Sequence, residues 1–100
     1  MRRAQFTVNA EGVQGNVGAE VTFKCLEGGV WRAWRKNPES DNFDLLLPYT
    51  LDWHGFTDDK GNELPSPKDE PDIVLKLYMD EQTKLIRLFL QGPDGESAKN

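Results

Sequence analysis

The N-terminal quarter of the chain alternates between apolar and polar residues, as half-buried β-strands do. Within residues 3–9 (RAQFTVN), Phe6 and Val8 fall on one side, and residues 19–26 (AEVTFKCL) repeat the pattern. The segment between them supplies three glycines and an asparagine, which are residues typical of turns. The pattern therefore predicts an N-terminal β-hairpin with a rather long loop.

After Gly28-Gly29 the apolar spacing changes to three and four residues, which predicts about four short helices. The predicted helices span residues 30–36, 42–53, 72–78 and 81–91. Asn37-Pro38 should end the first helix, because a residue before proline avoids the α region. Pro48 lies inside the second, where it either kinks the helix or splits it in two. We expect one α+β domain over residues 1–92, a β-hairpin followed by a small bundle of about four short α-helices, with residues 93–100 as a flexible polar tail.

Capping residues precede the later helices in the sequence. Ser40 or Asp41 can cap the second helix, Asp69 the third with Pro71 in its first turn, and Asp80 the last. The third helix is expected to turn four side chains inward: Ile73, Val74, Leu77 and Tyr78.

The composition is typical of a soluble globular chain, with 37% hydrophobic and 29% charged residues. The longest apolar runs are far shorter than the ~20 residues that span a bilayer, and the N-terminus does not read as a signal peptide. The single cysteine, Cys25, excludes an internal disulfide and a cysteine-rich zinc site and suits a reducing cytoplasm. Because Cys25 lies in an apparent strand, we expect it to be a small buried hydrophobe.

The net charge of −5 comes entirely from the second half of the chain. Residues 1–50 carry six basic and six acidic groups, whereas residues 51–100 carry six basic and eleven acidic groups. An acidic surface repels phosphate backbones, so nucleic acid is not an expected partner. The charge instead favours protein partners.

Residues 52–72 gather the only histidine, His54, with Trp53 and seven carboxylates. A zinc site needs two or three nitrogen or sulfur ligands, and Lys60 interrupts the acidic pattern of a calcium loop. Nothing marks Cys25 as a nucleophile for a histidine base. We therefore expect no enzyme activity, metal or cofactor. The stretch is predicted to be a polar connection between helices, with a tight turn at Gly61-Asn62, an inward Trp53 ring and an exposed His54.

Within residues 30–36, Trp31 and Trp34 share one helical face and the basic residues occupy another. This arrangement is typical of an amphipathic helix that packs on a core or a partner.

Residues 21–90 resemble the tail assembly chaperones of long-tailed bacteriophages in the order of four segments. These segments are GGVWRAWRK, FDLLLPYTLDW, TDDKGNELPSP and PDIVLKLYMDEQTKLIRLFL. The resemblance implies a chaperone that binds the hydrophobic tape measure protein and helps to recruit tail tube protein. It also implies a place in the host bacterial cytoplasm and absence from the mature virion. Self-association is a further possibility.

Such a chaperone needs an apolar groove for its client. The candidate groove residues are Trp31, Trp34, Tyr49, Trp53, Leu85, Leu88 and Phe89. A second interpretation stays open, in which all of them belong to the core. Two other functions also stay open: a small acidic phage protein that inhibits a host factor, and a structural tail or neck component. The pair Lys99-Asn100 can be encoded AAA-AAC, the core of a slippery heptamer if the preceding codon ends in A. We therefore add the hypothesis of a ribosomal frameshift to a longer form.

Overall fold

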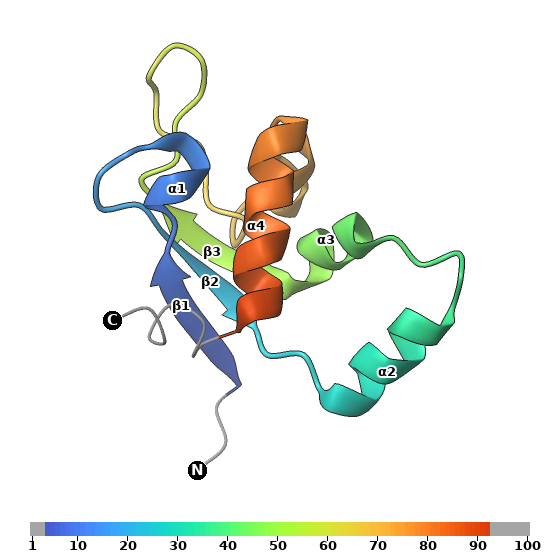
Figure 1. Ribbon diagram of the computed structural model, residues 1–100. Helices are drawn as coiled ribbons and strands as arrows, with labels where there is room; N and C mark the ends of the chain where they lie inside the picture. Colours follow the sequence, from blue (N-terminus) through green and yellow to red (C-terminus); the bar gives the residue numbers. More distant parts are fainter. Residues whose placement is uncertain (1–3, 93–100) are drawn as a thin grey trace.

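The computed structural model describes residues 4–92 and combines a small sheet with helices (Figure 1). Three antiparallel strands are ordered as they occur along the chain: β1 (Gln5–Asn9), β2 (Glu20–Lys24) and β3 (Thr50–His54). The α-helices are α1 (Glu11–Gln14), α2 (Gly28–Lys36), α3 (Leu46–Tyr49) and α4 (Met79–Gln91), and the 3-10 helices are η1 (Asn42–Leu45) and η2 (Pro71–Lys76). The prediction of a mixed α and β chain is confirmed. The predicted tail at residues 93–100 lies outside the described residues.

β1 and β2 form the antiparallel pair that alternation predicts at the N-terminus. Phe6 lies opposite Phe23 and Val8 opposite Val21, and all four side chains are buried on one face of the sheet. The loop between the strands contains α1, which ends at Gly15 in the left-handed conformation, with φ of 79°. A glycine suits this position because it has no Cβ to oppose a positive φ.

The third strand corrects the sequence prediction, which placed residues 42–53 in a helix. The helical part stops at Tyr49, and the next five residues form β3, which pairs with β2. The two strands shift register at a bulge, so that Thr22 faces Asp52 whereas Phe23 faces Thr50. The bulge leaves Thr50 and Trp53, three residues apart, both buried. Buried residues three apart in a bulged strand have the same spacing as the apolar residues on one face of a helix. This spacing explains why the sequence predicted a helix here.

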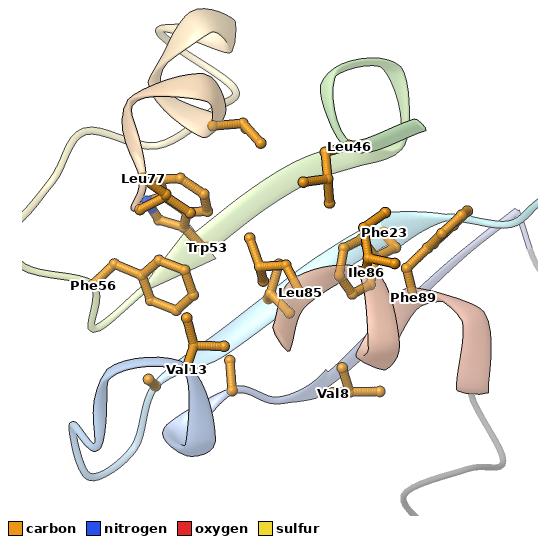
Figure 2. Packing of buried hydrophobic residues seen from close by; sticks show 14 of the residues in the cluster. Val8, Val13, Phe23, Leu46, Trp53, Phe56, Leu77, Leu85, Ile86 and Phe89 are labelled. Carbon is orange, nitrogen blue, oxygen red and sulfur yellow. The ribbon is translucent and has the colours of Figure 1, made fainter. Parts of the chain in front are cut away.

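α4 crosses the apolar face of the sheet and completes the core (Figure 2). Its Phe89 ring lies 5.3 Å from that of Phe23, 5.4 Å from Tyr49 and 6.5 Å from Phe6, measured between ring centroids. Leu85, one turn earlier, is fully buried. Each such side chain stabilises the fold by about 1.5–3 kcal/mol through removal of apolar surface from water. A two-stranded hairpin alone would be marginal, and α4 provides the cover that it needs.

The third predicted helix is instead the 3-10 helix η2, followed by a break before α4. Ile73, Val74 and Leu77 are buried as expected, but Tyr78 is 57% exposed, so its predicted inward orientation is wrong. Tyr78 occupies the N-cap position of α4, and its backbone N–H donates to Glu81 Oε1 at 2.9 Å. The phenol instead donates to Asp59 in the neighbouring loop.

The helices also do not form the bundle that the sequence predicts. Residues 4–92 contain five helical segments, since η1 runs directly into α3. None of the residues of α2, all within this described range, is buried. Figure 1 shows α2 set away from the sheet, with irregular chain on both sides of it.

Candidate interaction site

The helix α2 forms where the sequence predicts it, two residues longer at its start. Its first turn is closed by Trp31 N–H, which donates to the carbonyl of Glu27 at 3.0 Å. Its end is set by Pro38, because Asn37 adopts the extended conformation (φ −85°, ψ 112°) that a residue before proline prefers. Local sequence signals therefore define this helix at both ends.

The two faces of α2 differ as the sequence pattern predicts. Trp31 and Trp34 are half-buried, whereas the basic residues between and after them are exposed. The guanidinium of Arg35 lies 5.8 Å from the centre of the Trp31 ring, and Trp34 Nε1 donates to Asn42 Oδ1 at 3.2 Å. The apolar face of α2 is thus only partly covered by its own fold.

An apolar recess of about 370 Å³ lies between this face and the end of α4. Its lining residues are Phe6, Cys25, Leu26, Gly28, Trp31, Phe89, Leu90 and Gly92. A more open hollow of about 820 Å³ adjoins it and shares Cys25, Leu26 and Gly28. Leu90 in the recess is 40% exposed, and Val30, next to Trp31 in the sequence, is 46% exposed. The recess is therefore apolar and accessible from solvent, and we call it the α2–α4 recess.

Only two of the candidate groove residues meet in the α2–α4 recess, namely Trp31 from α2 and Phe89 from α4. Trp34 and Tyr49 are half-buried and pack against the core outside the recess. Leu88, also half-buried, lies in a different groove beside Val13.

Three of the candidate groove residues, Trp53, Leu85 and Phe89, are at least 95% buried. The Trp53 ring stacks on Phe56 with centroids 4.6 Å apart, and its Nε1 donates to the carbonyl of Pro65 at 3.0 Å. Figure 2 shows this pair and Leu85 within the packed interior. For these residues the core interpretation agrees with the structure.

Six recess residues were not among the candidates, and Cys25, Leu26 and Leu90 are three of them. Cys25 was expected to be buried in a strand, but β2 ends one residue earlier and the thiol is half-buried. Leu26 lies two residues before the start of α2, and Leu90 lies beside the buried stripe of α4. An apolar residue next to an element boundary was the signal that could have identified them.

The acidic stretch from residue 52 begins in β3 rather than at a helix end. Beyond the strand, Asp58 Oδ1 accepts hydrogen bonds from the backbone N–H of Lys60 and of Asn62, each at 2.9 Å. The bond from Asn62 is the main cause of the lowered pKa of Asp58. Gly61 has a φ of 84°, so the predicted tight turn is confirmed.

His54 is exposed, as expected, and its Nε2 lies 3.3 Å from Glu20 Oε1 on β2. Among residues 4–92, no three metal-ligating side chains are grouped to hold a metal ion. No helix in that part of the chain is long and apolar enough to cross a membrane.

Comparisons of the chain with protein-family models, with curated proteins and with solved structures find no match. The α2–α4 recess is the candidate site that the geometry offers.

Proposed function

We propose that the protein is a non-enzymatic assembly chaperone that holds an apolar helical segment of a partner protein. The observation that carries the proposal is the half-covered tryptophan face of α2 beside the solvent-accessible α2–α4 recess. The proposed client is a phage tape measure protein, as the resemblance in sequence to tail assembly chaperones implies. Tail tube protein is the second proposed partner.

The chemistry of the recess suits such a client. An amphipathic helix binds by placing apolar side chains in a groove, and each fully buried leucine or phenylalanine contributes about 1.5–3 kcal/mol. Trp31 and Leu90 offer apolar surface at this position, and neither is fully buried without a client. The net charge of −5 repels other copies of the chain and opposes aggregation of a protein with an exposed apolar patch.

The proposed place of action is the host bacterial cytoplasm during tail assembly. A chaperone leaves its client once the tail is complete, so mass spectrometry of purified virions should not detect the chain. Its detection there at a fixed copy number would favour the structural tail or neck component instead.

The direct test is co-expression with the tape measure protein, followed by measurement of the soluble fraction of that client. Leu90→Asp places a charge at an exposed position of the recess, and Val30→Asp does so at an exposed position of α2 next to Trp31, so each variant should still fold. Burial of an unpaired carboxylate against an apolar client costs several kcal/mol, so client solubilisation should fall at least tenfold. Val17→Asp is the matched control, since Val17 is 91% exposed and belongs neither to α2 nor to the recess.

Circular dichroism of each variant establishes that the fold is retained. The proposal fails if Leu90→Asp and Val30→Asp solubilise the client as well as the unmodified chain does. It also fails if Val17→Asp has the same effect as they do. Salt-sensitive capture of a nucleic-acid-binding host protein, with no effect on the client, would favour the inhibitor function.

A further inference from the structure

β1 is an edge strand whose outer hydrogen-bonding groups have no partner among residues 4–92. At the two ends of the β1–β2 ladder, Ala10 N–H donates to Ala19 and Cys25 N–H donates to the carbonyl of Ala4. Because bonded and non-bonded pairs alternate in an antiparallel ladder, the even-numbered residues of β1 bond to β2. The N–H and C=O groups of Gln5, Thr7 and Asn9 therefore point outward.

This edge lacks the features that usually block pairing with another chain. Natural edge strands are protected by charges, prolines or bulges. Residues 4–10 (AQFTVNA) contain no charged residue and no proline, and β1 pairs with β2 without a register shift. An extended segment can therefore add to β1 without steric or electrostatic obstruction from the strand itself.

A groove between the end of β1, α1 and α4 gives this edge a chemical preference. The groove has a volume of about 370 Å³ and is lined by Asn9, Gly12, Val13, Lys84, Arg87, Leu88 and Gln91. Lys84 and Arg87 are exposed, and no carboxylate of the described residues forms an ion pair with either of them. Leu88 and Val13 supply apolar surface beside them.

We propose that the outer edge of β1 binds an extended segment of a partner protein, with acidic side chains turned toward α4. Backbone groups of the segment pair with Gln5, Thr7 and Asn9, and alternate side chains project over the groove. Carboxylates at these positions meet Lys84 and Arg87, and an apolar residue between them meets Leu88. This surface is separate from the α2–α4 recess and does not depend on the chaperone function.

Charge also argues against a second copy as the occupant. Two copies paired antiparallel through their β1 edges would be related by a twofold axis near Thr7. Their two α4 helices would then face each other, each with Lys84 and Arg87 on the facing side. Like charges at close range oppose association, whereas an acidic segment neutralises both cations.

The test uses NMR titration of the ¹⁵N-labelled full chain with a capped probe peptide, Thr-Glu-Thr-Val-Thr-Glu-Thr. A matched probe carries lysine in place of both glutamates, and a third carries N-methyl groups at the backbone positions that would face β1. We expect the acidic probe to shift the amides of Gln5, Thr7 and Asn9, with a Kd at least tenfold lower than that of either other probe. The double variant Lys84→Glu/Arg87→Glu changes two exposed residues and should reverse the preference between the charged probes.

Absence of shifts at these three amides overturns the proposal, as does equal binding of the acidic and lysine probes. Unchanged binding of the N-methylated probe also overturns it, since the ladder would then not form. Shifts of the same amides that depend on protein concentration without any probe, together with a dimer in sedimentation, would assign the edge to a second copy. Leu90→Asp at the recess should leave the titration unchanged, so this test is independent of the chaperone test.

Discussion

Thr50 in β3 buries a hydroxyl group that has no hydrogen-bond partner among the described residues. Thr50 is 4% exposed, and its Oγ1 is enclosed. A buried polar group without a partner costs about 1–3 kcal/mol. Thr50→Val replaces the hydroxyl by a methyl of similar shape and should raise the free energy of unfolding by about 1 kcal/mol.

The measurement for Thr50→Val is thermal unfolding, with an expected rise in Tm of about 4 °C or more for a domain of this size. Thr22→Val is the control, because Thr22 Oγ1 is hydrogen-bonded to Thr7 Oγ1 at 2.8 Å across the β1–β2 pair. This variant loses a bond and should gain no stability. An equal gain in both would indicate strand propensity rather than relief of a buried hydroxyl.

Among the glycines of residues 4–92, Gly55 is the one with the least room for a side chain. Its φ is 82°, and a Cβ built on it would lie 2.8 Å from the Cα of Ala19. Gly61 has nearly the same φ, 84°, but nothing lies within 4 Å of its added Cβ. Gly61→Ala should therefore cost only the left-handed penalty of about 1–2 kcal/mol, and Gly55→Ala clearly more because backbone must also move. Urea unfolding of the two variants measures the difference, and equal losses would contradict the close approach to Ala19.

At the scale of elements, α2 is the helix most weakly attached to the fold. It has no buried residue, whereas α4 has three, Leu85, Ile86 and Phe89. Local opening is easiest where few apolar contacts are lost. We expect the amides of α2 to exchange with solvent at least 100-fold faster than those of α4, as measured by native-state hydrogen exchange. Equal protection in the two helices would show that α2 opens only with the whole domain.

Helix α2 also shows why part of the fold and of the candidate site could be predicted from the sequence. The boundaries of α2 depend on local signals, its glycines and Asn37-Pro38, and the sequence placed them nearly correctly. β3 depends on pairing with β2 and on a bulge, and neither leaves a local signal in the sequence. For the same reason Trp53 was predicted to line a groove, although its partners Phe56 and Pro65 enclose it.

The sequence identified only some of the residues that line the α2–α4 recess, because the recess joins residues that are distant in sequence. Trp31 was identified from the amphipathic pattern of its own helix. Leu90 and Phe6 became neighbours of the recess only through the crossing of α4 over the hairpin, which local periodicity does not encode. A local pattern predicts the face of an element, whereas the partner of that face follows from topology.

At the scale of the whole molecule, the carboxylate of Glu11 links the protonation state to the closure of the hairpin. Its Oε2 accepts hydrogen bonds from Asn9 Nδ2 at 2.9 Å and from Gly18 N–H at 3.1 Å, between the end of β1 and the start of β2. These bonds favour the charged form and lower the pKa of Glu11 below 4.5, with the bond from Asn9 as the larger cause. A pKa that is lower in the folded state than in the unfolded state makes stability depend on pH.

The sign follows from proton binding. Below pH 4.5 the unfolded chain binds a proton at Glu11 more readily than the folded chain does, so stability falls as pH falls through the folded pKa. We expect the difference in unfolding free energy between the unmodified chain and Glu11→Gln to be largest above about pH 5 and to shrink toward pH 3.

Urea unfolding at each pH measures this difference, with Glu39→Gln as a control whose carboxylate accepts no hydrogen bond from the described residues. Glu39→Gln removes the same charge from an exposed position and so controls for the loss of charge alone. A difference for Glu11→Gln that stays constant across this range would mean that the hairpin closes equally well around a protonated Glu11.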